Sequence, residues 1–172
     1  MKTKQKLFIL KLTSILLVLL ISSCSINYSF TGASISPDIK TISIDYFPNR
    51  ALMVNPNLSQ TFTEKLKDTF IGQTNLDLVK EDGDLQFSGS IVDYRTSPVA
   101  ITGDMASQTR LTITVEVSFE NTKEPEKSFT KRFSQYEDYP SDQSLDAVQD
   151  QLVNEIVDKL TNDIFNASVS NW

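Results

Sequence analysis

The sequence contains no histidine and only one cysteine, Cys24, among its 172 residues. Without histidine, the chain lacks the commonest general base and the commonest neutral metal ligand, so histidine-based catalysis and histidine metal sites are excluded. With one cysteine, no disulfide can form within the chain, and stability must come from burial and backbone pairing. Internal repeats and low-complexity tracts are missing as well, and the length fits one compact domain.

Basic side chains are also scarce outside the first residues. Four of the sixteen Lys and Arg residues lie at the N-terminus, which leaves twelve against twenty-two Asp and Glu and a formal net charge of −10. A body of this charge is a poor partner for nucleic acid and for anionic membrane surfaces. No nucleic-acid partner is therefore expected.

The N-terminus carries a basic segment followed by the apolar run LTSILLVLLI, from Leu12 to Ile21. This order is typical of a secretory signal peptide, and the run is too short to span a bilayer comfortably. It ends in Ile21-Ser22-Ser23-Cys24, which resembles the bacterial lipoprotein processing box, with small residues at the scissile bond and a sulfur that accepts the lipid. We expect Cys24 to be lipidated; the alternative is an ordinary signal peptide with an incidental cysteine.

These signals divide the chain into three parts. Residues 1–23 are expected to be a removed signal peptide, residues 24–38 a lipidated tether, and residues 39–168 a single domain. No aspartate follows Cys24, and no acidic cluster lies in the next few residues. By analogy with known sorting rules, this favours the periplasmic side of the outer membrane, with the acyl chains in its inner leaflet.

The first half of the domain predicts a strand followed by a helix. Residues 40–47 (KTISIDYF) alternate with period two, as a strand does. Asn55 and Pro56 offer a helix start, with Asn55 as the cap. The helix is expected to end near Gly72. Its apolar face recurs every four residues, at Leu58, Phe62, Leu66 and Phe70.

The second half predicts further strands and a long helix. A short strand-like piece lies at 75–79 and an Asp-Gly turn at 82–83, and a strand follows from 85 to 94. Within that strand, Gly89 indicates a bulge or a close approach by another backbone. After an expected loop at 96–107 come a clearly alternating strand at 111–119, a strand with Phe129 and Phe133, and a helix capped by Ser141 and Asp142. The apolar stripe of that helix is Leu145, Val148, Leu152, Ile156, Leu160 and Ile164.

The order of these elements predicts an α+β fold. A strand-helix-strand unit favours a parallel pair, whereas the two tight connections that follow favour an antiparallel meander. We therefore expect a two-layer sandwich in which two helices cover one face of a four-stranded mixed β-sheet.

The sequence does not indicate an enzyme or a cofactor. Nucleophilic catalysis needs an activated side chain beside a base, and no Ser-x-x-Lys or Gly-x-Ser-x-Gly motif is evident. The acidic run at 81–84 (EDGD) lacks the ligand spacing and closing glutamate of a calcium loop, so a plain turn is the better interpretation. A hydrolase stays a weaker alternative, which requires a buried pair of carboxylates in a cleft.

The few basic residues near the expected strands are Arg95, Arg110, Lys131 and Arg132. Lys131 lies between Phe129 and Phe133 on the same face of its strand. It either protects a sheet edge or meets a negative ligand such as a phosphorylated acyl-sugar. Solvated surface charge is the default interpretation for each of the four.

Several segments resemble the LptE family of lipopolysaccharide-assembly lipoproteins, in the form found in Bacteroidetes-like bacteria. After the expected lipidated cysteine come residues 28–34 (YSFTGAS), 40–44 (KTISI) and 46–49 (YFPN). Residues 57–64 (NLSQTFTE) and 83–87 (GDLQF) extend the similarity, which covers nearly the whole chain. None of these segments carries a catalytic motif.

This resemblance implies a fold of two helices on a four-stranded mixed sheet and a function without catalysis. Family members sit inside the lumen of the outer-membrane β-barrel LptD, help it to assemble and bind lipopolysaccharide during its insertion into the outer leaflet. The expected position is thus lipid-anchored, facing the periplasm and the barrel lumen, with Lys131 and Arg132 as possible lipopolysaccharide contacts. The alternative is a periplasmic lipoprotein that binds a glycan or a small ligand.

Overall fold

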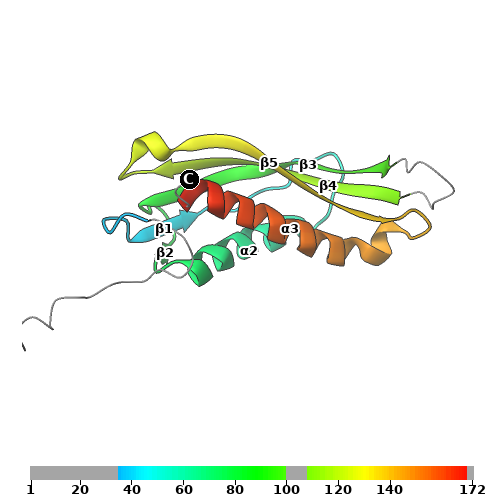
Figure 1. Ribbon diagram of the computed structural model, residues 1–172, viewed down its shortest axis with the longest axis horizontal. Coiled ribbons are helices and arrows are strands. Elements are labelled where there is room, and N and C mark those ends of the chain that lie inside the picture. Colours follow the sequence, from blue (N-terminus) through cyan, green and yellow to red (C-terminus); the bar gives the residue numbers. More distant parts are fainter. Residues whose placement is uncertain (1–34, 100–107, 170–172) are drawn as a thin grey trace, which may run out of the picture. The chain divides into compact units, whose positions relative to one another are not determined.

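The computed structural model describes residues 35–99 and 108–169, which hold five strands, two α-helices and one 3₁₀ turn (Figure 1). Cys24 and the segment 1–34 lie outside these residues, as does most of the expected loop at 96–107. The elements are β1 (Thr41–Ile44), α2 (Leu58–Gln73), β2 (Asp77–Val79), β3 (Leu85–Val99), β4 (Gln108–Asn121), η1 (Pro125–Lys127), β5 (Phe129–Pro140) and α3 (Leu145–Val169).

The strands form one mixed sheet in the order β2-β1-β3-β4-β5. Strand β1 is parallel to both β2 and β3, whereas β3, β4 and β5 form an antiparallel meander. The predicted α+β fold is confirmed, with five strands in place of four. The additional strand is β2, the short piece expected near 75–79, which enters the sheet by pairing with β1.

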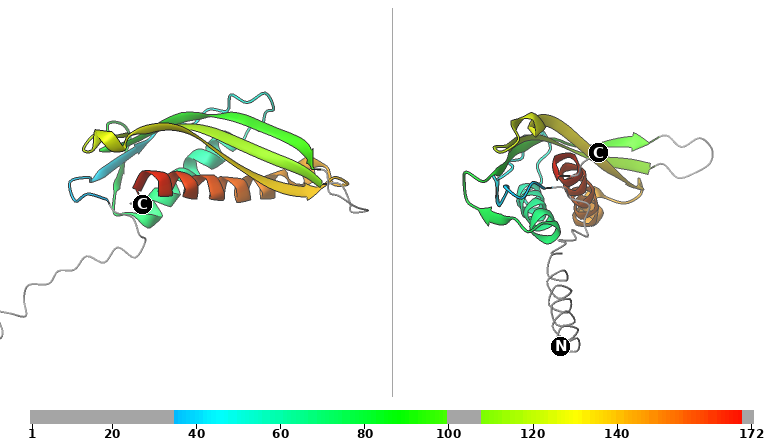
Figure 2. Two further views of the ribbon diagram at one scale, coloured as in Figure 1. Left: turned by 45° about the horizontal axis from the view of Figure 1, so that its top comes forward. Right: turned by 60° about the vertical axis from the view of Figure 1, so that its left-hand side comes forward.

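Both helices lie on one face of the sheet, and the opposite face carries no helix among the described residues (Figure 2). Strand β4 shows the reason in its sequence. Leu111, Ile113, Val115, Val117 and Phe119 are buried under the helices, and the residues between them point to the uncovered face. Strict alternation of apolar and polar residues is what a sheet covered on one side requires. We call the helix-free side the open face.

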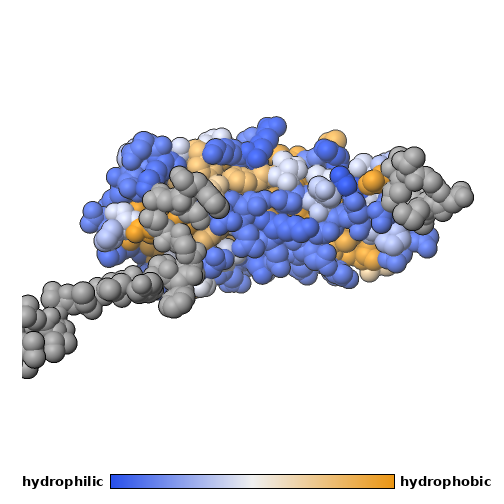
Figure 3. All heavy atoms as spheres, in the orientation of Figure 1, coloured by the Kyte–Doolittle hydropathy of each residue, from blue (hydrophilic) through white to orange (hydrophobic). Residues whose placement is uncertain are grey.

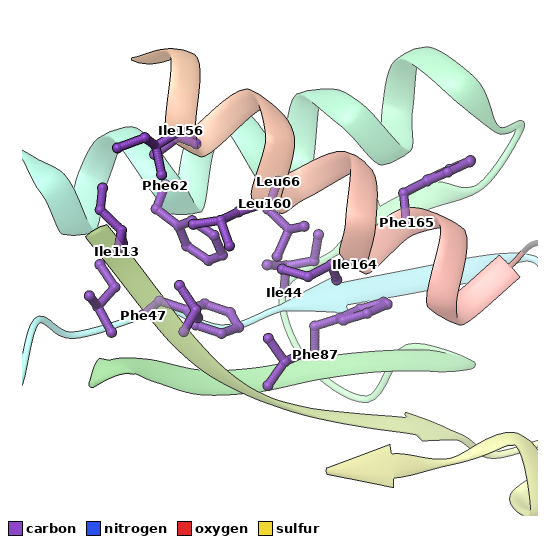
Figure 4. Close-up of a cluster of buried hydrophobic side chains, with 14 of the residues drawn as sticks. Ile44, Phe47, Phe62, Leu66, Phe87, Ile113, Ile156, Leu160, Ile164 and Phe165 are labelled. Carbon is purple, nitrogen blue, oxygen red and sulfur yellow. The ribbon is translucent and has the colours of Figure 1, made fainter. Parts of the chain in front are cut away.

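The core lies between the helices and the sheet and is rich in phenylalanine (Figure 4). The ring of Phe70 in α2 lies 4.8 Å from the ring of Phe87 in β3 and 5.1 Å from that of Phe165 in α3, centroid to centroid. Each such buried side chain contributes about 1.5–3 kcal/mol of transfer free energy. The predicted apolar stripe of α2 is fully buried. Helix α3 packs on both α2 and the sheet.

Gly89 in β3 allows a close approach by the backbone of β4 and by the side chain of Phe47. A Cβ atom at this position would overlap the carbonyl oxygen of Glu116 in β4 and come within 2.7 Å of Phe47 Cε1. Its φ of 155° is also one that side-chain-bearing residues rarely adopt. The predicted close approach at Gly89 is confirmed, and the irregularity in the strand pairing lies further along, between Ile91 and Asp93.

Both helices begin later than their predicted caps. Helix α2 begins at Leu58, and the Asn55 side chain instead accepts the Asn57 backbone N–H at 2.9 Å, closing a turn just before the helix. Helix α3 begins at Leu145, after the turn at 141–143. Strand β3 continues through Val99, beyond the predicted end at 94, because residues 96–99 pair with β4. Cap-forming side chains mark where a helix can begin, but local turns compete for them.

The acidic run at 81–84 lies in the connection between β2 and β3. Asp84 accepts backbone N–H groups of Lys40 at 2.8 Å and Thr41 at 3.1 Å, and the Lys123 ammonium lies 3.1 Å from it. These donors hold the pKa of Asp84 well below its usual range, and the Lys40 N–H has the largest effect. The predicted turn is thus a link between the entrance of β1 and the start of β3.

Candidate functional site

Strand β5 places the two predicted lipopolysaccharide contacts on opposite faces of the sheet. Lys131 pairs with Val117, which is buried on the helix-covered face, whereas Arg132 pairs with Glu116 on the open face. Successive side chains of a strand point to opposite sides. Lys131 and Arg132 therefore cannot approach one ligand from the same face.

On the open face, Arg132 takes part in a row of polar contacts between neighbouring strands. Its Nε lies 2.8 Å from Glu116 Oε2. The Thr114 and Ser134 hydroxyls are 2.9 Å apart, and Thr130 donates to Ser118 at 3.3 Å. Both members of the Arg132–Glu116 pair are exposed, so this ion pair contributes little to stability.

A second ion pair on the open face is bidentate. Arg110 donates from Nε and Nη2 to the two carboxylate oxygens of Asp138, at 2.7 and 2.9 Å. The guanidinium also lies 3.6 Å from the centre of the Tyr136 ring. This hydrogen bonding lowers the pKa of Asp138 and raises that of Arg110. Arg95 on the same face pairs with Asp93, so three of the four basic residues singled out in the sequence are neutralised by a neighbouring carboxylate.

On the helix-covered side, Lys131 borders a cavity of about 460 Å³ at one end of the domain. We call this the end cavity. Its apolar wall is formed by Ile35, Ile39, Leu85, Phe129 and Val169, and the η1 turn supplies its polar rim. Val169 places the C-terminal end of α3 against the start of β5. The Lys131 ammonium lies 4.8 Å from the centre of the Phe129 ring, within the range of a cation–π contact.

Two carboxylates, of Glu124 and Glu126, and two ammonium groups, of Lys127 and Lys131, line the end cavity. Lys127 on the rim is bound by Glu124, with Nζ and Oε2 2.9 Å apart. Lys131 has no carboxylate within 4 Å among residues 35–99 and 108–169. An apolar wall beside an unneutralised ammonium can accept a group that is part apolar and part anionic.

Sequence reasoning missed a group of exposed apolar side chains between β1 and α2. Tyr46, Leu52 and Val54 are 61%, 104% and 74% exposed, although their neighbour Phe47 is fully buried. The run at 51–54 (ALMV) was a possible signal, but it has no period of two or four. The segment is held by pairing of Asn49 with Ile91 and by the Phe47 N–H, which donates to Thr63 Oγ1 at 3.1 Å.

Residues 35–99 and 108–169 contain no fully buried carboxylate. In the same part of the chain, no three side chains of the metal-ligating types lie together in a cluster. Neither α2 nor α3 is long and apolar enough to cross a membrane. The helices present a largely hydrophilic outer surface (Figure 3).

Solved structures define the class of this domain. A minor lipoprotein from Acinetobacter baumannii is 13% identical, with a TM-score of 0.50 over 74% of this chain and 91% of that chain. The uncharacterized lipoprotein B from Nitrosomonas europaea is 10% identical, with a TM-score of 0.49 over 83% of this chain and 88% of that one. A comparison with curated proteins found no match. The chain thus has the two-layer α+β fold of the first of these structures.

The family follows from a second comparison. The family model described as "LptE: Lipopolysaccharide-assembly" matches residues 39–168, which is most of the chain. The protein therefore belongs to the LptE family, as its sequence resemblance implied. Its membership makes it a lipopolysaccharide-assembly protein of a family of non-enzymatic outer-membrane lipoproteins.

Proposed function

We propose that this protein is lipidated at Cys24, lies at the outer membrane facing the periplasm, and plugs the lumen of an LptD-type β-barrel. In that position it helps the barrel to assemble and aids insertion of lipopolysaccharide into the outer leaflet. Family membership supports this proposal. The structural observation that carries it is the open face, a helix-free sheet surface lined with hydroxyl groups and ion pairs.

The open face has the properties that a polar lumen requires. Barrel interiors of outer-membrane proteins are polar, so a plug must present polar groups along its strands. Unpaired charges would be costly in such a confined space, because each would lose water without gaining a partner. Arg95, Arg110 and Arg132 each already have a carboxylate partner within the domain. The open face can therefore enter a lumen without leaving these charges unpaired.

Co-purification tests the plug. After mild detergent extraction, the wild-type chain should be recovered with a large outer-membrane β-barrel. Replacing Thr114 and Ser118 together by Arg adds bulk and charge in the centre of the open face, and it should sharply reduce recovery of the barrel. Gln151→Arg together with Asn154→Arg, both on the exposed side of α3, is the matched control, since it adds the same two charges away from the open face. Recovery of a lone wild-type monomer, under conditions that preserve other barrel complexes, would contradict the proposal.

We further propose that Lys131 and Arg132 contact lipopolysaccharide, with Lys131 the more important. The end cavity offers an apolar wall to acyl chains, and the Lys131 ammonium offers a partner to a lipid A phosphate. Arg132 lies on the other face and is already paired with Glu116, so its contribution should be smaller.

Charge-reversal variants test these contacts. Lys131→Glu should weaken lipopolysaccharide binding more than Arg132→Glu does, as measured by titration of lipopolysaccharide. Lys80→Glu is the control, because Lys80 is highly exposed and the variant has the same net charge. Equal affinities for the Lys131 and Lys80 variants would remove Lys131 from the proposal.

The alternative function is a periplasmic lipoprotein that binds a glycan or small ligand. The observation that favours it is the end cavity, which is concave and has Phe129 in its wall. Tight binding of a soluble oligosaccharide without acyl chains, lost in Phe129→Ala, together with absence of any co-purifying barrel, would establish this alternative.

A further inference from the structure

Strand β5 is the long edge of the sheet. The sheet order leaves β2 and β5 outermost, and β2 has three residues whereas β5 has twelve. No strand among residues 35–99 and 108–169 pairs with the outer side of β5. Such an edge presents unpaired backbone N–H and C=O groups and is a template for another strand. Figure 2 shows β5 along the margin of the sheet above α3.

The charges along β5 are arranged with opposite signs at its two ends. Lys131 and Arg132 follow the start of the strand, and Glu137 and Asp138 precede its end. A second copy of β5 lying antiparallel would place the basic end of each strand beside the acidic end of the other. A parallel copy would place like charges together, which is unfavourable for directly opposed residues.

From this pattern we propose that β5 pairs antiparallel with β5 of a second copy of this chain, forming a symmetric dimer with one continuous sheet. Ser134 lies on the two-fold axis opposite Ser134 of the second copy. In this register Lys131 is opposite Glu137, and Arg132 is opposite Tyr136. Directly opposed residues of an antiparallel pair share a face. Lys131 and Glu137 meet this condition, because both pair with buried residues of β4, Val117 and Leu111.

The two charges that the dimer brings together have capacity for a further partner. Lys131 has no salt bridge within the described part of the domain. Glu137 is bound there by Lys159 of α3 through Oε1, which leaves Oε2 for a second ammonium. By contrast, Arg132 and Asp138 are already held by Glu116 and Arg110. The Lys131–Glu137 contact occurs twice by symmetry, so it selects this register.

The dimer is a property of the free protein and does not depend on the proposed plug. Pairing would cover the β5 edge whenever the chain is outside its barrel, and thus protect it from uncontrolled strand addition. The open face stays uncovered in this arrangement, since the second copy joins the sheet at its margin.

Two single variants and their mixture test the dimer, using the whole chain in detergent without lipopolysaccharide. In Lys131→Glu, two acidic residues face each other twice, and in Glu137→Lys two basic residues do so. Each variant should raise the dimer dissociation constant about 10- to 100-fold relative to wild type, because two attractive pairs become repulsive. An equimolar mixture should form a heterodimer of near-wild-type affinity, in which every facing pair has opposite signs. Sedimentation equilibrium and native mass spectrometry give the two readouts.

Recovery in the mixture excludes misfolding of either variant as the cause of dissociation. A wild-type chain that stays monomeric at high micromolar concentration would overturn the proposal, as would variants that dimerise like wild type or a mixture that stays monomeric. Arg50→Glu, an exposed charge reversal outside β5, should leave the dissociation constant unchanged. None of these outcomes affects co-purification with a barrel, so failure of the dimer and failure of the plug are separable.

Discussion

Asp84 is a carboxylate that links two segments far apart in the chain. It joins the start of β3 to the chain entering β1 through the Lys40 and Thr41 N–H groups. Because these donors favour the charged form, the pKa of Asp84 lies far below its ordinary value of 3.8. The adjacent Gly83 is packed so closely on β1 that a Cβ atom would lie 2.5 Å from the Ser43 nitrogen. Asp84 and Gly83 thus secure the same junction.

We predict that Asp84→Asn lowers the free energy of unfolding by about 1–2 kcal/mol at pH 7, since hydrogen bonds to a charged acceptor become neutral ones. A carboxylate with a lowered folded pKa stabilises the fold above its unfolded pKa, and this contribution disappears as the pH falls. The difference between wild type and variant should therefore shrink below about pH 4. Urea denaturation at pH 7 and at acidic pH measures both effects. Asp82→Asn, at an exposed neighbouring carboxylate, should change stability little; an equal loss there would contradict the assignment.

Lys131 and Arg132 show what sequence can say about single residues. Their alternation with Phe129 and Phe133 correctly assigned Lys131 to the face of the apolar residues. The sequence of β5 does not show which face of the sheet the helices cover or that Glu116 lies beside Arg132. Both follow from the pairing of β5 with β4. A strand sequence contains side-chain parity but not the identity of its neighbours.

At the scale of elements, β3 and α2 contain glycines with opposite roles. Gly89 in β3 lies against Glu116 and Phe47, whereas Gly72 near the end of α2 has open space around its Cα. In a crowded position an added methyl forces the strands apart, and in an open helical position it only restricts the unfolded chain.

We predict that Gly89→Ala destabilises the protein by about 2–4 kcal/mol, through steric overlap and an unfavourable φ. Gly72→Ala is the matched control and should stabilise it by about 0.5–1 kcal/mol, since alanine is the better helix former. Chemical denaturation of both variants checks the pair. A small effect at Gly89 would show that β3 and β4 can move apart at this position.

The elements differ in how far their sequences predicted them. The four-residue repeat of α2 and the alternation of β4 were sufficient, because each contains many residues that obey one period. The three residues of β2 are too few to show a period, and β2 enters the sheet only because β1 lies beside it. The exposure of Leu52 and Val54 was not predicted either, since it follows from the path of the chain between β1 and α2.

At the scale of the whole molecule, a single core joins both helices to the sheet. Phenylalanines from α2, β3 and α3 contact one another in this core. Separation of either helix from the sheet would therefore expose apolar side chains of the other elements. The chain has one cysteine, so disulfides within the chain play no part.

We predict one cooperative unfolding transition for the domain, as expected for a small protein with one core. Helix content followed by circular dichroism and aromatic packing followed by near-ultraviolet signals should give the same urea midpoint, and a reductant should not shift it. Two separated midpoints would show that the β3–β4–β5 meander and the helical layer unfold independently.

The sequence by itself determined the periodic elements, the α+β class, the resemblance to the LptE family and the expected lipidation at Cys24. These follow from local order along the chain, which needs no knowledge of distant neighbours. Only the tertiary structure decided the fifth strand, the opposite faces of Lys131 and Arg132, the end cavity and the free edge of β5. Each of these depends on which segments lie side by side, and that is set by pairing and packing between residues far apart in the chain.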